Sequence, residues 1–119
     1  MLTNWNKRYL NLAHYISKWS RDPNRKCGAV IVGQDNIEKA IGYNGLPNNV
    51  DLNDSNTKKR YEKPQKYMWV EHAERNAIYT AGRNGVSLDG CKMYVTYFPC
   101  CDCARAIIQS GIKEVYSPK

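Results

Sequence analysis

The 119-residue sequence has no apolar run long enough to span a bilayer, and its first residues contain no apolar core of signal-peptide length. We therefore expect a cytoplasmic protein with no membrane association. The sequence also has no internal repeat and no low-complexity tract. Although 42% of the residues are hydrophobic, two separate cores would each be too small to be stable, so we expect one domain over residues 1–119.

Acidic side chains are also scarce. Eleven Asp and Glu residues stand against eighteen Lys and Arg residues, which leaves a net charge of +7. This excess suits an anionic ligand, such as a nucleotide phosphate or a nucleic-acid backbone, and it suits a solvated basic surface about equally well. The five cysteines cannot all pair, and without a secretion signal they are better interpreted as thiols or metal ligands than as a disulfide framework.

The first third of the chain predicts a helix followed by a β-hairpin. Apolar residues at helical spacing predict an amphipathic helix that ends near Ser20, before a turn at residues 22–24. Its apolar stripe, expected in the core or in a subunit interface, consists of Leu2, Trp5, Tyr9, Leu12, Ile16 and Trp19. Residues 27–32 and 37–43 predict two strands joined by a turn.

The rest of the chain predicts an α/β fold. The segment from Gly45 to about Lys66 is polar and has no period, which leaves open whether it is functional or disordered. A helix is expected from residue 71 or 72 to the glycines at 82–85, then a strand at 92–97, a helix from Pro99 and a strand at 113–117. In the last helix the residues expected to face inward are Ala104, Ile107 and Ile108. Strand, helix and strand in this order require a parallel crossover, so we expect helices covering a mixed sheet of four evident strands.

Two motifs contain residue types that bind metal: His72-Ala73-Glu74 and, one strand later, Pro99-Cys100-Cys101-Asp102-Cys103. Cys100 and Cys103 are three positions apart in the first turn of a helix, so their sulfurs share one face and can reach one ion. The positive end of the helix dipole is expected to lower their thiol pKa. With one imidazole and two thiolates, a tetrahedral Zn²⁺ keeps one open position, as in catalytic zinc sites.

Glu74 is the expected proton carrier. It follows His72 by two residues, so the two side chains diverge on a helix and the carboxylate remains free of the metal. A carboxylate beside a zinc ion that activates water can pass a proton to a substrate nitrogen, which is hydrolytic chemistry. The competing interpretations are a structural zinc site in which Glu74 is an ordinary helix N-terminal acid, and a metal-free packing role.

Four other residues with metal-binding side chains are not expected to be ligands. Cys101 lies about 100° round the helix from Cys100 and should point elsewhere. Cys27 and Cys91 each begin a strand and are interpreted as small buried hydrophobic residues, with a second metal site as the alternative. His14 lies beside the apolar face of the first helix without neighbouring ligands, so we expect it to be packed or exposed.

Three segments resemble the deoxycytidylate deaminase family of the zinc-dependent cytidine deaminase superfamily: GYNGLP at 42–47, HAERNAI at 72–78 and TYFPCCDCARAIIQSGIKEVY at 96–116. The motifs H-x-E and P-C-x-x-C alone fit the whole superfamily, which includes free-base, nucleoside and tRNA adenosine deaminases. The additional segment GYNGLP narrows the resemblance to the deoxycytidylate deaminase family. The resemblance implies a cytidine-deaminase-like three-layer α/β/α fold with a mixed sheet of four to five strands. It also implies hydrolysis of dCMP to dUMP and ammonia, which supplies dUMP for thymidine nucleotide synthesis.

The resemblance also assigns roles to individual residues. His72, Cys100 and Cys103 would hold Zn²⁺, Glu74 would shuttle protons, and Asn44 would contact the sugar. The other expected substrate contacts are Ala73, Tyr97, Phe98 and Pro99 around the base, and Ser20, Arg25 and Lys26 at the phosphate. A generic surface loop is the alternative interpretation of Arg25 and Lys26.

Family members are commonly homo-oligomers regulated by dCTP and dTTP, and a triphosphate ligand would bring Mg²⁺ with it. Asn48-Asn49 replaces the glycine often found soon after GYNGLP, in the region associated with this control. A fifth strand and a C-terminal helix, usual in the superfamily, would follow Tyr116, after which the sequence has three residues. The cluster Lys58-Lys59-Arg60 is better interpreted as a solvated loop than as a triphosphate site.

Alternative functions remain open from the sequence. Within enzymes, they are a deaminase acting on dCTP, on a nucleoside or on a base in nucleic acid, although the chain is short for a nucleic-acid groove. Outside enzymes, the alternative is a zinc-stabilised binding module. Replacement of Glu74 separates the two classes, because only the enzyme depends on a proton carrier.

Overall fold

The computed structural model describes residues 4–48, 50, 53 and 55–118. A four-stranded sheet with the order β2-β1-β3-β4 forms its centre. The strands are β1 (Gly28–Val32), β2 (Glu38–Tyr43), β3 (Lys92–Val95) and β4 (Glu114–Tyr116). β1 pairs antiparallel with β2 and with β3, and β3 pairs parallel with β4, so the predicted hairpin and the predicted parallel crossover are both confirmed.

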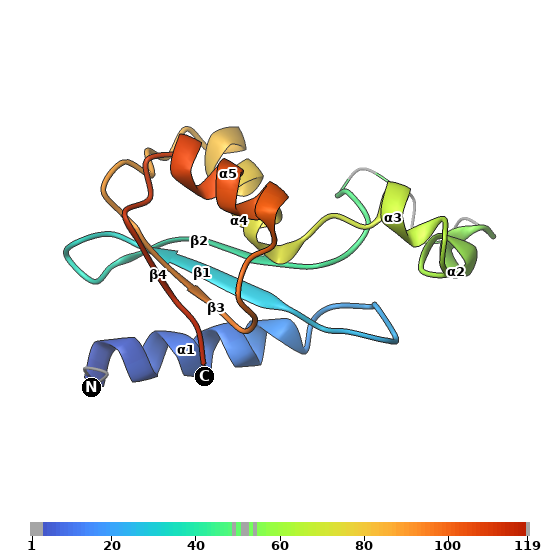
Figure 1. The fold of residues 1–119 in the computed structure, drawn as a ribbon, viewed down its shortest axis with the longest axis horizontal. Coiled ribbons are helices and arrows are strands. Elements are labelled where there is room, and N and C mark those ends of the chain that lie inside the picture. Colours follow the sequence, from blue (N-terminus) through green and yellow to red (C-terminus); the bar gives the residue numbers. More distant parts are fainter. Residues whose placement is uncertain (1–3, 49, 51–52, 54, 119) are drawn as a thin grey trace.

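Helices cover both faces of this sheet (Figure 1). Helix α1 (Asn4–Ser17) lies on one face, and helices α4 (Ala73–Arg83) and α5 (Cys101–Gln109) lie on the other. All five residues of β1 are buried: Ala29 and Ile31 belong to the core beneath α4 and α5, and Val30 and Val32 to the core against α1. This double burial explains the uninterrupted apolar run of β1, and the α/β/α architecture agrees with the expected fold.

The buried face of α1 agrees with the predicted stripe only in part: Ile16 is buried, and Tyr9 and Leu12 are partly buried against the same core. The residues that face the sheet are Asn6, Leu10, Ala13, Ile16 and Ser17, whereas the side chains of Trp5 and Trp19 are 43% and 48% exposed. A Cβ atom at Gly28 would lie 2.1 Å from the carbonyl oxygen of Ala13, so α1 approaches β1 too closely for bulky side chains between them. The tryptophans therefore lie at the rim, and Leu2 falls outside the described residues.

Asn6 is buried in this interface because it has a polar partner. The hydroxyl of Tyr94, on β3, donates a hydrogen bond of 2.7 Å to its side-chain oxygen. A buried amide is tolerated when it is paired in this way.

Helix α5 also differs from expectation at one position. Its buried residues are Cys103 and Ile107, Ala104 is half-buried, and the side chain of Ile108 is 75% exposed. Cys103 and Ile107 are four residues apart and share one face, and Ile108 lies about 100° farther round the helix. The prediction that Ile108 faces inward was wrong.

The sequence left the role of the polar segment from Gly45 to about Lys66 open. The structure has two one-turn helices there and just after it, α2 (Thr57–Arg60) and α3 (Lys66–Trp69). They lie beyond the end of the sheet, and we call residues 57–69 the limb (Figure 1). The guanidinium of Arg60 lies 4.2 Å from the centre of the Trp69 ring, so a cation–π contact joins the helices. Some residues of this segment fall outside the described part of the chain. Among the helices that the structure describes, none is long and apolar enough to cross a membrane.

Candidate metal centre

The candidate ligands lie at the starts of two helices. His72 is the N-cap residue of α4, Cys100 is the N-cap residue of α5, and both have extended backbone angles. Cys103 lies one turn into α5. Because α4 and α5 pack on the same face of the sheet, their N-terminal ends bring residues from two distant motifs together.

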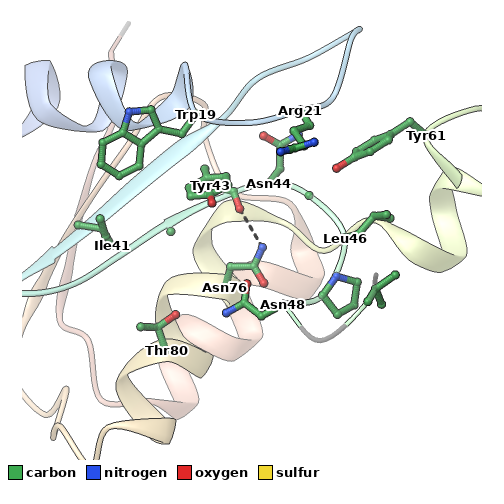
Figure 2. Close-up of a pocket in the computed structure, with 14 residues that line it drawn as sticks. Trp19, Arg21, Ile41, Tyr43, Asn44, Leu46, Asn48, Tyr61, Asn76 and Thr80 are labelled. Carbon is green, nitrogen blue, oxygen red and sulfur yellow. Dashed lines mark hydrogen bonds between the residues drawn. The ribbon is translucent and has the colours of Figure 1, made fainter. Parts of the chain in front are cut away.

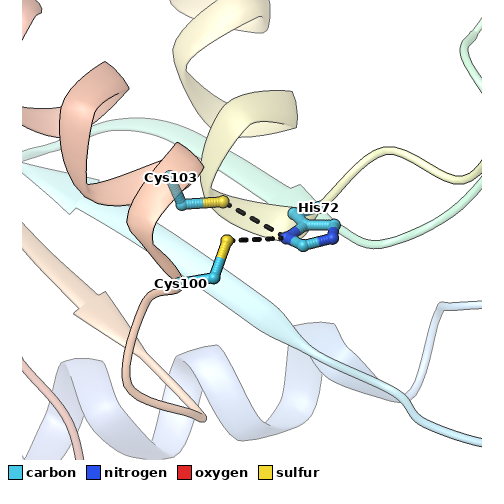
Figure 3. Close-up of side chains that lie close together, drawn as sticks. All are labelled: His72, Cys100 and Cys103. Atoms are coloured by element: carbon cyan, nitrogen blue, oxygen red, sulfur yellow. Dashed lines mark hydrogen bonds between the residues drawn. The ribbon is translucent and has the colours of Figure 1, made fainter. Parts of the chain in front are cut away.

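The three ligand atoms lie at distances that suit one ion. The Nδ1 atom of His72 is 3.5 Å from Sγ of Cys100 and 3.3 Å from Sγ of Cys103 (Figure 3). All three atoms lie within 4.8 Å of one another. Typical zinc–nitrogen and zinc–sulfur bonds at a tetrahedral angle place N and S roughly 3.5 Å apart, so the donor set fits zinc in both chemistry and spacing. Within the described residues, this is the one such group of three.

Glu74 is buried in the first turn of α4, beside this group. Burial raises the pKa of its carboxyl above the ordinary value, more than the nearby His72 and Arg75 lower it. A raised pKa makes the carboxylate a stronger base than an ordinary Glu side chain, which suits a group that accepts a proton and later donates it.

The thiol of Cys103 behaves differently from the prediction. Burial raises its pKa strongly, and the negative charge of Glu74 raises it further. The expected lowering by the helix N-terminus is therefore outweighed, because desolvation disfavours an isolated thiolate. A cation within bonding distance reverses this balance and deprotonates a coordinating thiol.

Ion pairs connect the two ligand-bearing helix starts. Arg75 of α4 donates a hydrogen bond to Glu71 and lies 4.0 Å from a carboxylate oxygen of Asp102 on α5, which also accepts from Arg105. Sequence reasoning missed this network, although the spacing of Glu71 and Arg75 by four residues across the start of α4 was the available signal.

The segment around the predicted phosphate contacts is held by its own side chains. Ser20 is buried, and its hydroxyl donates to the backbone oxygen of Asn44 at 2.7 Å. The exposed side chain of Lys26 turns back to donate to the backbone oxygen of Ser20. The exposed guanidinium of Arg25 lies 4.9 Å from the centre of the Tyr97 ring, three residues before Cys100.

Asn44, the predicted sugar contact, is buried and hydrogen-bonded within the chain. Its side-chain oxygen accepts from the N–H of Cys27 at 2.7 Å. Its side-chain nitrogen donates to the carbonyl oxygen of Arg25 at 2.8 Å and to the carboxylate of Asp22 at 3.4 Å. Both donor hydrogens are thus engaged, and a sugar contact through the second lone pair of the oxygen stays a prediction.

Asp22 is the residue that sequence reasoning missed most clearly. Its carboxylate is fully buried, accepts hydrogen bonds from the N–H groups of Asn24 and Arg25, and lies 2.9 Å from Nζ of Lys66 on α3. The sequence predicts a turn at residues 22–24 and assigns no role to the side chain of Asp22. A pairing with a lysine 44 positions later has no local sequence signal.

The predicted base contacts have different environments. Tyr97 and Phe98 are 51% and 82% exposed in the single chain, and Pro99 is half-buried. Ala73 is buried against β2, where a Cβ atom at Gly42 would lie 2.4 Å from its carbonyl oxygen. Their contacts with a base stay predictions.

A separate pocket of about 290 Å³ opens along β2 (Figure 2). It is lined by aromatic and amide side chains that include Trp19, Tyr43, Tyr61 and Asn76, and the side-chain nitrogen of Asn76 donates to the carbonyl oxygen of Tyr43 at 2.8 Å. No candidate zinc ligand lines it. The candidate metal centre is therefore distinct from this pocket.

The other cysteines and His14 are located much as expected. Cys101 is exposed and outside the ligand group, Cys91 is buried, and Cys27 is half-buried. Burial raises the pKa of the Cys27 thiol to about 11. His14 is exposed.

Known proteins resemble this chain in sequence and in fold. Residues 3–118 match the family described as the cytidine and deoxycytidylate deaminase zinc-binding region. An uncharacterized deaminase of Aliivibrio fischeri is 41% identical over the whole chain, which spans 76% of that protein. The deoxycytidylate deaminase of Homo sapiens is 42% identical over 93% of this chain, which spans 62% of the human protein.

Solved structures agree with this relationship. The apo dCMP deaminase of cyanophage S-TIM5 superposes with a TM-score of 0.79 at 31% identity, covering 98% of this chain and 84% of that one. A cytidine deaminase from Burkholderia pseudomallei, at 21% identity and a TM-score of 0.64, shares the fold. The chain belongs to the cytidine and deoxycytidylate deaminase family of zinc-binding proteins.

Proposed function

We propose that this protein deaminates dCMP hydrolytically to dUMP and ammonia. The observation that carries the proposal is the placement of buried Glu74 beside the group formed by His72, Cys100 and Cys103. The matching dCMP deaminase of cyanophage S-TIM5, which was also solved in complex with dCMP and dUMP, supports the choice of substrate.

His72, Cys100 and Cys103 are proposed to hold one zinc ion. When bound, zinc supplies Lewis-acid activation of water for attack at C4 of the pyrimidine. The protein fixes the ligands through the two helix starts, and the pairing of Arg75 with Glu71 and its proximity to Asp102 tie those starts together. Such outer contacts orient metal ligands and are expected to affect metal affinity.

Glu74 is proposed to move the proton. Its raised pKa, caused by burial, suits a group that accepts one proton of the attacking water and donates it to N3 of the ring, and then accepts the remaining proton on that oxygen and donates it to the leaving amine. Its position two residues after His72 keeps the carboxylate out of the ligand group while holding it nearby.

The loop from Ser20 to Lys26 is proposed to bind the phosphate, with Arg25 as its exposed cation that contacts Tyr97. The contact of Arg25 with Tyr97 places a positive charge beside the segment that leads into Cys100. We further propose a single domain over residues 1–119 that acts in the cytoplasm as a homo-oligomer, with dCTP and dTTP as effectors and Mg²⁺ entering only with a triphosphate.

Ammonia release tests the proposed function. The zinc-loaded protein would be offered deoxycytidine, dCMP, dCTP, cytosine and a cytosine-containing single strand separately, with Glu74→Gln as the matched inactive control. Selective release from dCMP supports the proposal. Release only from dCTP or from the strand would leave the chemistry intact and replace the substrate, and no release from any of them would favour a binding module.

A further inference from the structure

The buried carboxylate of Asp22 organises the loop that precedes β1. Its Oδ1 atom accepts hydrogen bonds from the N–H groups of Asn24 at 2.9 Å and Arg25 at 3.4 Å. Its Oδ2 atom accepts from the side-chain nitrogen of Asn44 at 3.4 Å. One side chain therefore fixes the backbone of the loop and also the turn that follows β2.

The carboxylate receives its charge partner from a distant part of the chain. Nζ of Lys66, the first residue of α3, lies 2.9 Å from Oδ2 of Asp22. The side chain of Lys66 is 17% exposed and that of Asp22 is 0% exposed, so the pair is largely shielded from water. A buried carboxylate that loses its cation is strongly unfavourable, because its desolvation is no longer compensated.

This pairing gives the limb that carries α2 and α3 a contact with the loop. A few residues after the limb, the chain reaches His72. Just before His72, Glu71 forms an antiparallel β-bridge with Gly45, with backbone hydrogen bonds of 3.1 and 2.8 Å. Lys66 thus contacts the loop that precedes β1 and belongs to the segment that continues along the chain into the start of α4.

We propose that Lys66 is a positioning residue: by pairing with Asp22, it holds the Ser20–Lys26 loop in the form that binds the nucleotide phosphate. The inference rests on the proposed function, since it assigns a phosphate to this loop. Lys66 does not contact the substrate, and it acts through Asp22 and the N–H groups that Asp22 holds. The sequence assigned no role to the polar segment from Gly45 to about Lys66. In this proposal, the segment holds the phosphate-binding loop in place through Lys66.

The discriminating comparison is between dCMP and deoxycytidine. Replacement of Lys66 by Met keeps the apolar stem and removes the charge, so the loop loses its order and the phosphate loses its contacts. We expect KM for dCMP to rise at least about tenfold while kcat stays within about threefold, since lost positioning of a remote group appears chiefly in binding. We expect kcat/KM for deoxycytidine, which has no phosphate, to stay nearly unchanged.

Two further variants keep the test independent of simple misfolding. Lys66→Arg restores the charge and should recover most of the affinity for dCMP. The double variant Asp22→Asn with Lys66→Met removes both charges, so its KM should be no worse than that of Lys66→Met alone, because the residues act through one interaction. Lys63→Met, an exposed lysine of the same limb, is the matched control and should behave like the wild type.

The outcomes separate this inference from the proposed function. If Lys66→Met lowers kcat/KM equally for dCMP and deoxycytidine, or if the effects of Asp22→Asn and Lys66→Met add, the positioning role is overturned while dCMP deamination stands. If the wild-type protein releases no ammonia from dCMP, the proposed function and this inference fall together. A rise in KM for dCMP alone, rescued by Lys66→Arg, establishes the role.

Discussion

Nδ1 of His72 lies 3.3 Å from the sulfur of Cys103, although 31 positions separate the two residues in the chain. The contact exists because two helices begin at the same place over one face of the sheet. This convergence is the basis of the first two predictions.

Removing a ligand is expected to remove the metal. We predict that Cys100→Ser lowers bound zinc from about one ion per chain to a small fraction, because a hydroxyl replaces one of two thiolates. Metal content measured by atomic emission after dialysis checks this expectation. Cys101→Ser is the matched control, since Cys101 is exposed and outside the ligand group, and it should retain zinc. Equal zinc contents in the two variants would contradict the assignment of Cys100.

Removing the proton carrier should leave the metal in place. We predict that Glu74→Gln keeps zinc but lowers kcat for dCMP on the order of 10²- to 10⁴-fold, the usual contribution of general acid–base catalysis. Steady-state ammonia release together with metal analysis provides the measurement. A variant with full zinc and a wild-type rate would exclude Glu74 as the proton carrier.

The Asp22 carboxyl is predicted to make stability depend on pH. Burial by itself raises its pKa, but the N–H groups of Asn24 and Arg25 together with Lys66 outweigh burial and hold the pKa below its usual value of 3.8. The folded state therefore favours the charged form. Its contribution is complete above the unfolded pKa and is lost as the pH falls through the lower folded pKa.

Thermal unfolding between pH 7 and pH 3 tests this linkage. The wild type should exceed Asp22→Asn in Tm at neutral pH, and the difference should shrink as the pH drops below about 4. Zinc loss at acid pH affects both proteins, so the comparison isolates Asp22. A difference that stays constant or grows on acidification would show that the charge of Asp22 does not stabilise the fold.

Close packing of α4 on β2 gives a prediction at a glycine. A Cβ atom at Gly42 would lie 2.4 Å from the carbonyl oxygen of Ala73 and 2.5 Å from the nitrogen of Ala77, so Gly42→Ala should destabilise the fold by about 1–3 kcal/mol through overpacking. Gly82→Ala, a substitution within α4, is the control. Nothing lies within 4 Å of its added Cβ, so it should leave stability unchanged or raise it by up to about 1 kcal/mol. Urea denaturation ranks the two variants, and equal stabilities would refute the close approach.

The sequence predicted the four strands and the three longer helices, and it named the three residues whose ligand atoms the structure brings together. Local spacing is informative about β1 and about α4, because an uninterrupted apolar run and a glycine breaker are local signals. The motif around Cys100 and Cys103 implies a shared ion because both residues lie in one helical turn.

Tertiary contacts decided the rest. The buried face of α1 depends on how closely its backbone approaches Gly28. The spacing of apolar residues in the sequence does not predict that distance. The pairing of Asp22 with Lys66 joins two polar segments, neither of which has a periodic pattern. Desolvation of Cys103 likewise arises from neighbours that are remote in sequence, so the local effect of the helix end could not predict it.

His72 and Cys100 are both N-cap residues, and therefore the ligands belong to the ends of their helices that are anchored over the sheet. α4 and α5 end at Arg83 and Gln109, which are exposed and lie at the opposite ends of the helices from the ligands. Insertions or fusions placed after Arg83 or Gln109 therefore act on surface that the ligands do not share. The same scaffold can accept new appended parts there while its chemistry stays where it was.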